Sequence, residues 1–492
     1  MNRPFDKAKY KALLEGLEAT EVTKSDLEFS FRLDSEYYQK EYLAIEKLAL
    51  DKNGVNLGTL TDFLIGPFGS AFKTENYEEE TTGEEESNYR YIRGKDVKPF
   101  FLMNDDNKFI PESDFSRLQK YEVLPNDVLI SVVGTLGNAS IALEKELPAI
   151  FSCKSTILRN SKINSFYLLA YLNSNFGRKL LLRKTRGAVQ AGLNLDDLKT
   201  LTIPRLSDDI QFEVEKLVRN ANHQLELSQS SYKDAENLLL AELGLLNWQP
   251  TEKNTSVVSF ANSFFATGRL DAEYYQPFYD EVEKIIKSKG VVTLEQICSE
   301  INYGTVPTSP YTEDESGIPY IKGMNIKNGQ IKGELDCITD TDDLPDKFFT
   351  QEGDIIISQM GTVGDVGVVK KSEVGWLFAS FTIRVRLLDQ TKYNPLFVGL
   401  YIQKIAKEYY LKRNIAQASV RQNTDLPTIK NLYIPNVSIE IQNEIADLMK
   451  QSQTAQAESK KSLELAKKVV EVTIEQDEEM ALKLIRGDQN NA

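Results

Sequence analysis

Two basic segments, each followed by a run of small and amide side chains, contain the residues whose types best suit binding chemistry. Arg178–Arg186 has five cations and no acid, and it runs into Gly187–Asn194. Its counterpart runs from Lys404 to Arg413 and continues into Ala416–Asn423. Lysine and arginine neutralise phosphates without reading sequence, whereas glutamine and asparagine pair with adenine and arginine with guanine. The pattern is typical of a nucleic-acid surface. The alternative, a plain solvated helix end, is less favoured because the pattern occurs twice.

Catalytic and metal-binding patterns are missing from the sequence. The single histidine, His223, falls in the middle of a long helical pattern, so multi-histidine metal sites and nucleophile–histidine–acid catalysis are excluded. There is no Gly-x-x-x-x-Gly-Lys-Ser/Thr phosphate loop and no Asn/Asp-Pro-Pro-Tyr/Phe run. The scattered cysteines Cys153, Cys298 and Cys337 predict no disulfide framework and fit a reducing cytoplasm. We therefore expect a binding module with no catalytic residue, metal site or cofactor of its own.

The net charge is acidic but unevenly distributed. The 492 residues include 58 Lys and Arg and 73 Asp and Glu, which gives a formal charge of −15. Seven of the carboxylates lie in Glu75–Glu86, which has no basic residue. We expect a solvated loop there, and repulsion of wrong ligands is the alternative. No stretch reaches the roughly 18 apolar residues of a membrane span.

The chain contains an internal repeat. Four motifs recur in the same order, at offsets between 227 and 237 residues. The pairs are Phe31–Tyr38 with Gly268–Tyr275, Tyr91–Val97 with Tyr320–Ile326, Asp127–Gly137 with Asp354–Gly364, and Leu198–Pro204 with Ile429–Pro435. Ordered matches with drifting offsets indicate a duplicated unit whose loops differ in length.

A long helix follows each repeat. Apolar or small residues recur at steps of three and four from Ile210 to Leu239, and again 231 residues later from Ile441 to Val470. We predict one helix within residues 206–246 and another within 437–486, each on the order of 50–65 Å long. Such narrow stripes need a close partner, so we expect the two helices to pack on each other as a coiled-coil pair. Two separate surface helices are the alternative.

Mixed α/β patterns fill the regions before the helices. Short β-branched runs at Asp127–Val133, Asp354–Ser358 and Thr382–Leu388 alternate with turn signals, and helical patterns span Ser165–Lys184 and Pro395–Arg413. We predict α/β domains with irregular, partly antiparallel sheets at residues 26–205 and 247–436. Residues 1–25 echo the end of the central helix and are predicted to form an N-terminal helix that completes the repeat.

These motifs, in this order and duplicated, resemble the specificity (S) subunit of type I restriction–modification systems over about residues 8–485. The resemblance implies an α/β fold with two target-recognition domains separated by a pair of long antiparallel coiled-coil helices. It implies a non-catalytic subunit of a methyltransferase/endonuclease complex in which each domain reads half of a split DNA site. The helices would fix the spacer between the half-sites.

The resemblance also implies partners and a location. These are double-stranded DNA, two adenine-N6 methyltransferase subunits that use S-adenosylmethionine, and motor-nuclease subunits, all in a prokaryotic cytoplasm near the nucleoid. Two alternatives stay open: a specificity chain that serves a fused nuclease–methyltransferase, and, in a different class, an acidic DNA mimic with anti-restriction activity or a coiled-coil scaffold.

Candidate DNA contacts come from both domains. The two cores diverge between the matched motifs, which predicts an asymmetric site. In the first domain the candidates are Lys73, Arg93, Lys95, Thr135, Arg183, Lys184, Arg186 and Gln190. In the second they are Tyr303, Thr305, Lys322, Asn325, Gln359, Thr362, Lys412, Arg413, Arg421, Gln422 and Asn423. Replacing both Arg183 and Arg186 by alanine is predicted to weaken binding and lower its salt dependence, whereas Gln422→Ala should relax one half-site.

Overall fold

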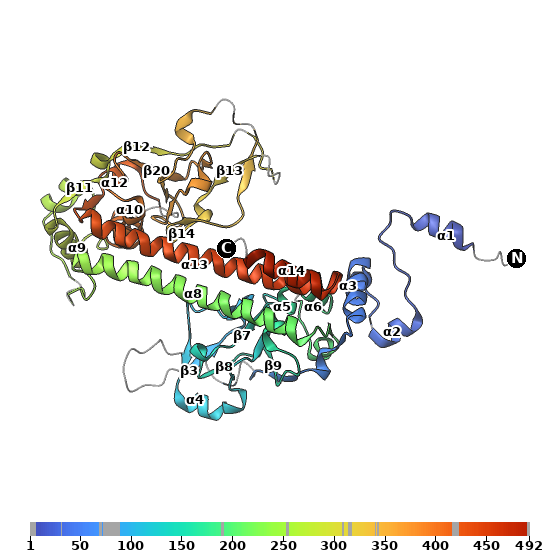
Figure 1. Ribbon diagram of the computed structural model, residues 1–492. Coiled ribbons are helices and arrows are strands. Elements are labelled where there is room, and N and C mark those ends of the chain that lie inside the picture. Colours follow the sequence, from blue (N-terminus) through green and yellow to red (C-terminus); the bar gives the residue numbers. More distant parts are fainter. Residues whose placement is uncertain are drawn as a thin grey trace. The chain divides into compact units, whose positions relative to one another are not determined.

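The structure, a computed structural model, describes residues 6–30, 32–67, 71, 89–187, 191–251, 255–307, 309–312, 317–339, 341, 344–415 and 423–489. The chain divides into two units. Unit 1 comprises residues 1–225 and 456–492, and unit 2 comprises residues 226–455. Each long helix therefore contributes one half to each unit (Figure 1).

The two long helices are α8 (Asp208–Leu243) and α13 (Ile439–Glu475), of 36 and 37 residues. They pair antiparallel within each unit. In unit 1 the Ser459 hydroxyl donates to the carbonyl of Ala221 at 2.7 Å, and in unit 2 the Ser452 hydroxyl donates to the carbonyl of Ser228 at 2.7 Å. Small buried side chains let the two backbones approach this closely. The predicted helix pairing is confirmed.

The C-terminal helical region differs from the single helix predicted over residues 437–486. The long helix ends at Glu475, and a separate helix, α14, spans Glu478–Gln489. The Asp477 carboxylate accepts a hydrogen bond from the Met480 amide at 2.8 Å, so it caps the new helix. At the other end of the chain, the side chains of α1 (Lys7–Leu14) are not buried.

Unit 1 contains a five-stranded sheet in the order β2-β9-β6-β7-β4, a three-stranded sheet β5-β3-β8 and a β1-β10 pair. The strands are β1 (Val55–Asn56), β2 (Asp62–Ile65), β3 (Tyr89–Ile92), β4 (Phe100–Phe101), β5 (Phe109–Ile110), β6 (Val128–Ser131), β7 (Ala139–Ile141), β8 (Ala149–Phe151), β9 (Ser155–Arg159) and β10 (Thr202–Ile203).

Unit 2 contains a four-stranded sheet β12-β20-β17-β18, a three-stranded sheet β16-β13-β19 and the pairs β11-β21 and β14-β15. The strands are β11 (Val291–Thr293), β12 (Cys298–Tyr303), β13 (Ile318–Ile321), β14 (Ile326–Lys327), β15 (Gln330–Ile331), β16 (Asp336–Ile338), β17 (Ile355–Ser358), β18 (Val366–Val368), β19 (Leu377–Phe378), β20 (Thr382–Leu387) and β21 (Tyr433–Pro435).

The two units repeat one topology. Antiparallel β2-β9-β6-β7 corresponds to antiparallel β12-β20-β17-β18, and parallel β3-β8 corresponds to parallel β13-β19. The predicted duplication therefore has a structural counterpart, and the mixed α/β class with partly antiparallel sheets is confirmed.

The run of small and amide residues at 187–194 in unit 1 and at 416–423 in unit 2 is called the basic loop here, after the cations that precede it. The helix before each basic loop is interrupted in one unit and continuous in the other. In unit 1, α5 (Ser165–Asn173) ends at Ser174, whose hydroxyl caps α6 (Asn175–Arg183). In unit 2, α10 (Pro395–Tyr401) continues through a π-helix, η12 (Ile402–Leu411), into α11 (Lys412–Asn414). The remaining α-helices are α2 (Lys24–Ser30), α3 (Lys40–Asp51), α4 (Glu112–Arg117), α7 (Leu195–Lys199), α9 (Pro277–Ser288) and α12 (Leu426–Lys430).

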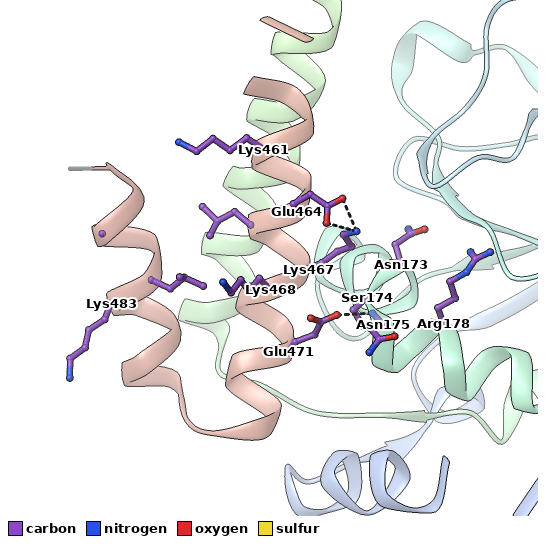
Figure 2. A pocket seen from close by; sticks show the side chains of 13 residues that line it. Asn173, Ser174, Asn175, Arg178, Lys461, Glu464, Lys467, Lys468, Glu471 and Lys483 are labelled. Carbon is purple, nitrogen blue, oxygen red and sulfur yellow. Dashed lines mark hydrogen bonds and ion pairs between the residues drawn. The ribbon is translucent and has the colours of Figure 1, made fainter. Parts of the chain in front are cut away.

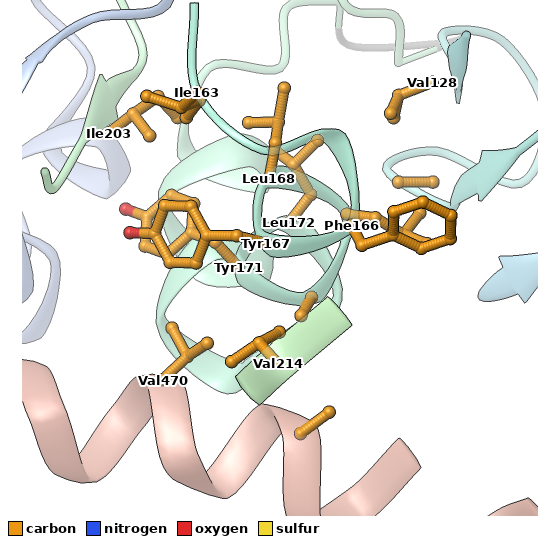
Figure 3. Packing of buried hydrophobic residues seen from close by; sticks show 14 of the residues in the cluster. Val128, Ile163, Phe166, Tyr167, Leu168, Tyr171, Leu172, Ile203, Val214 and Val470 are labelled. Atoms are coloured by element: carbon orange, nitrogen blue, oxygen red, sulfur yellow. The ribbon is translucent and has the colours of Figure 1, made fainter. Parts of the chain in front are cut away.

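Helix α5 forms the centre of the unit 1 core (Figure 3). The Tyr167 and Tyr171 side chains lie on one side of the helix, and their buried hydroxyls donate to the carbonyls of Pro204 and Thr202 at 2.7 and 2.8 Å. Val214 of α8 and Val470 of α13 belong to the same cluster. Burying each aliphatic side chain contributes about 1.5–3 kcal/mol, so this cluster fixes the long helices to the domain of unit 1.

Candidate nucleic-acid interface

Each unit presents a hairpin with an exposed threonine at its tip. The β6–β7 turn spans Gly134–Gly137 and exposes Thr135, and the β17–β18 turn spans Gly361–Gly364 and exposes Thr362. The glycines at both ends of each turn have φ between +75° and +88°, a region that other residues rarely adopt. The Gly-Thr-x-Gly motif is thus required by the turn, and the turn presents the threonine side chain to solvent.

The ends of the basic loop lie beside this hairpin. In unit 1, Val133 bridges Gly192, and the Leu193 amide donates to the carbonyl of Val132 at 3.0 Å. In unit 2, Met360 bridges Asn423 in the same way. The Gln359 side-chain amide donates to the carbonyl of Thr424 at 2.9 Å. The hairpin turn and the ends of the basic loop, which are far apart in the sequence, therefore lie side by side in each unit. In unit 2 the Gln359 side chain joins them.

Arg186 closes the base of the loop in unit 1. Its backbone exchanges hydrogen bonds of 2.9 and 2.8 Å with Gly192, and its guanidinium binds the Asp197 carboxylate at 2.6 Å. The carboxylate raises the pKa of Arg186. The side chain is 42% exposed, so it can also meet a phosphate.

Arg183 and Lys184 do not lie on this surface. The Arg183 side chain is 2% exposed, binds the Glu46 carboxylate at 2.7 Å and donates to the carbonyl of Tyr37 at 2.6 Å. The Lys184 ammonium donates to the Tyr37 hydroxyl at 3.2 Å, and burial lowers the pKa of Lys184. Burial argues against direct DNA contact by either cation. The charge run predicted a nucleic-acid surface, but Leu180 and Arg183 share the inner face of α6.

Arg413 occupies the matching place in unit 2. Its guanidinium donates to the carbonyl of Tyr274 at 3.1 Å and binds the carboxylates of Asp280 and Glu283 at 2.7 and 3.1 Å. The neighbouring Lys412 is exposed and pairs with Glu408, one turn earlier. Lys412 can therefore reach a ligand, whereas Arg413 is already bound on several sides.

Several other candidates are engaged in the fold. Arg93 binds the buried Asp96 at 2.8 Å, and Lys95, 55% exposed, binds Asp106 at 2.9 Å. The adjacent cations hold the pKa of Asp106 well below its usual range. Of the two cations, Lys95 has the more exposed side chain.

In the second domain, too, several candidates are buried or bonded within the fold. Asn325 is 3% exposed and bonds the backbone of its own turn at Lys322, Lys332 and Glu334. Thr305 is 9% exposed, and the Tyr303 hydroxyl accepts the Leu426 amide at 3.2 Å. These roles are structural.

Lys322 pairs with Asp336, and its ammonium lies 3.8 Å from the centre of the Tyr311 ring. Lys73, Gln190, Arg421, Gln422 and the acidic run 75–86 lie outside the described residues. The candidates that the structure exposes are Lys95, Thr135, Arg186, Thr362, Lys412 and Asn423. Whether any of them touches DNA stays a prediction.

A cation-lined groove of about 970 Å³ in unit 1 was not predicted. Its basic residues come from α6, α13 and α14, and Glu471 of α13 accepts the Asn175 amide at 2.6 Å (Figure 2). The basic lining residues are Arg178, Lys461, Lys467, Lys468 and Lys483. The seven-residue spacing of Lys461 and Lys468 places both on one helix face, and this spacing could have revealed them. Glu464, which pairs with Lys467 at 2.7 Å, and Glu471 also line the groove, so cations outnumber carboxylates there by five to two.

Among the residues with described positions, no group of histidine, cysteine and carboxylate side chains could hold a metal ion. No helix in the same part of the chain is long and apolar enough to span a membrane.

Comparisons with known proteins match the second domain to a family. Residues 287–466 match the family model described as "Type I restriction modification DNA specificity domain". No curated protein matches.

Three solved structures match most of this chain at low sequence identity. A type I restriction–modification S subunit from M. genitalium shares 14% identity with a TM-score of 0.47, covering 86% of this chain and 94% of that one. The HsdS subunit from Thermoanaerobacter tengcongensis shares 15% identity with a TM-score of 0.28, covering 86% and 96%. A structure described as showing complex assembly and conformational transition of the type I R-M system shares 16% identity with a TM-score of 0.31, covering 86% and 97%. Residues 287–466 therefore resemble a type I restriction modification DNA specificity domain, and the family resemblance predicted from the duplicated motifs is confirmed.

Proposed function

We propose that the chain is the DNA sequence-specificity subunit of a type I restriction–modification complex and reads a bipartite, asymmetric site. The supporting observation is that the topology of the matched domain recurs in unit 1, with the same hairpin beside a basic loop. Two domains that share one topology but expose different residues could each bind a different half-site.

The proposal assigns the chemistry to partners. The chain supplies recognition, two adenine-N6 methyltransferase subunits supply S-adenosylmethionine-dependent methylation, and motor-nuclease subunits supply cleavage. The exposed cations would neutralise phosphates, and the hairpin tips would meet the DNA at each half-site. The groove lined by Arg178, Lys461 and Lys468 offers a second basic surface for an acidic region of a partner.

Affinity purification of the tagged chain from its own cells tests this proposal. We expect a co-purifying subunit with an Asn-Pro-Pro-Phe/Tyr motif, and loss of N6-methyladenine at one split sequence when the chain is deleted. A co-purifying protein that carries nuclease and methyltransferase together would instead favour the fused system. A chain that purifies alone, binds no duplex at low salt and leaves methylation unchanged would contradict the proposal.

A further inference from the structure

We infer that the Arg-Leu-Asp-x-Glu-Tyr-Tyr motif of each unit is a clamp that positions the base of the basic loop, and that Arg183 and Arg413 are positioning residues. The clamp is defined in unit 1 by Arg32, Asp34, Tyr37, Tyr38 and Arg183. In unit 2 it comprises Arg269, Asp271, Tyr274, Tyr275 and Arg413. The inference rests on the proposed function for its DNA readout alone.

In unit 1 the clamp holds the residues just after α6. Arg32 binds Asp34 through two hydrogen bonds of 2.6 Å and donates a third to the carbonyl of Thr185 at 3.1 Å. Arg183 approaches from the helix and donates to the carbonyl of Tyr37 at 2.6 Å. The centre of the Tyr37 ring lies 4.8 Å from the Arg32 guanidinium and 4.1 Å from the Arg183 guanidinium. The helix end and the motif are thus fixed to each other from both sides.

Unit 2 repeats the arrangement contact for contact. Arg269 binds Asp271 at 2.6 and 2.5 Å and donates to the carbonyl of Ile415 at 3.2 Å. Arg413 donates to the carbonyl of Tyr274 at 3.1 Å, and the Tyr274 ring lies 4.8 and 4.7 Å from the two guanidiniums. In both units the second tyrosine hydroxyl donates to the carbonyl of the motif arginine, at 3.2 Å from Tyr38 and 3.1 Å from Tyr275.

The carbonyl that the clamp holds leads directly to the candidate interface. Thr185 precedes Arg186, which pairs with Gly192, and Gly192 bridges Val133 at the start of the β6–β7 turn. A chain of backbone hydrogen bonds therefore connects the clamp to the hairpin that exposes Thr135. In unit 2 the clamp fixes Ile415, and Asn423 bridges Met360 beside the corresponding hairpin.

The exposure of Arg183 and Arg186 distinguishes a residue that positions the loop from one that can contact a phosphate. Arg183 is 2% exposed and paired with Glu46, so reaching a phosphate would require breaking a buried ion pair. Arg186, three residues later, is 42% exposed. A contact residue lowers the salt dependence of binding when it is removed, by about 0.9 in the slope of log affinity against log salt. A positioning residue leaves that slope unchanged.

The experiment compares Arg32→Lys and Arg183→Ala with the matched control Arg186→Ala, in the full chain with its co-purifying subunits. Lysine keeps the charge of Arg32 but cannot bind Asp34 and Thr185 together in the planar geometry of arginine. Hydrogen–deuterium exchange is measured in peptides that cover Val132–Asn138 and the two ends of the loop, residues 185–187 and 191–194. Affinity for a random-sequence duplex, measured across salt concentrations, reports on phosphate contacts.

We expect Arg32→Lys and Arg183→Ala to accelerate exchange several-fold in those peptides, with unit 2 peptides and the salt slope unchanged. Arg186→Ala should lower the slope and change exchange little. Unchanged exchange in Arg32→Lys, or a lower slope for Arg183→Ala in a folded chain, would overturn the inference. If Arg183→Ala fails to fold, Arg32→Lys decides alone. If the wild-type complex binds no duplex, the proposed function is contradicted. The hydrogen-exchange measurement still tests whether the clamp positions the loop.

Discussion

Units 1 and 2 share a backbone frame but place buried charge differently. Ile157 of β9 lies opposite Leu129, and Arg384 of β20 lies opposite Ile356, so the two residues occupy one position in the repeat. Both side chains are fully buried. Arg384 donates to Asn302 at 2.8 Å and to the carbonyl of Phe349 at 3.1 Å, and it pairs with Glu300. Unit 2 thus buries a charge where unit 1 buries an apolar side chain, and unit 2 supplies hydrogen-bonding partners for that charge.

At a second position, too, unit 2 has a charged residue, Lys332, where unit 1 has an apolar one, Met103. Arg90 of unit 1 is an example in the opposite direction. The amide of Met103 bonds the carbonyl of Asp96, and the amide of Lys332 bonds the carbonyl of Asn325, so these two residues also correspond. Unit 1 buries an arginine of its own, Arg90 in β3, which donates to the carbonyl of Met103 at 2.7 Å. Apolar packing defines the shared frame, whereas Arg384 in unit 2 and Arg90 in unit 1 are buried charges that the other unit does not have at the matching position.

The largest expected effect comes from breaking the ion pair that both units share. Asp354→Ala leaves Arg386 and the fully buried Arg384 without this carboxylate, which lies 2.7 and 3.9 Å from them. We expect a loss of about 3–5 kcal/mol in the stability of unit 2. Asp127→Ala removes the equivalent carboxylate from Arg159, which is 22% exposed, so the loss in unit 1 should be smaller.

Hydrogen exchange in β17 and β6 measures the two losses separately. Equal losses of protection in the two strands would show that burying Arg384 does not increase the stability lost when Asp354 is removed. The two units would then not differ in this respect.

The next effect tests a feature that the units share. Ser459→Leu in unit 1 and Ser452→Leu in unit 2 each insert a large side chain where a hydroxyl reaches the backbone of α8. Overpacking costs about 1–3 kcal/mol, and we expect similar losses at both positions. Urea unfolding measures them, with the exposed Glu458→Leu as the control. A loss in one unit only would mean that the helices pair closely in that unit alone.

A smaller effect is expected when unit 2 is given the residue of unit 1. Arg384→Ile leaves Asp354 bound to Arg386, and Glu300 is 44% exposed, so water can solvate its charge. Exchanging a buried ion pair for an apolar side chain is often nearly neutral, so the unfolding free energy should change by about 1 kcal/mol or less. A loss as large as that of Asp354→Ala would assign the stability of unit 2 to Arg384 itself.

Sequence predicted the frame better than the surface. The small-residue stripes of α8 and α13 have one physical use, which is close packing against a partner helix, so the helix pairing followed from them. The basic run Arg178–Arg186 has two uses, since Arg183 is buried on the inner face of α6, whereas Arg186 lies beyond the end of the helix and is exposed. Periodicity with Leu180 would have placed Arg183 inside. The break at Ser174 depends on capping contacts, which composition does not reveal.

The last prediction concerns the pH dependence of unit 2. Burial, with help from Lys370 and Lys327, lowers the pKa of Lys332 from 10.5 to about 8. Between these two values the unfolded chain binds more protons at this side chain than the folded chain does, so stability should rise as the pH increases from about 8 toward 10.5. Lys332→Met, which installs the unit 1 residue Met103, should remove this contribution and flatten the pH dependence of urea unfolding in that window. Water reaches part of this side chain and screens its charge, so we expect the smallest of the four effects. A variant whose stability rises as steeply as that of the wild type would assign the rise to other titrating groups.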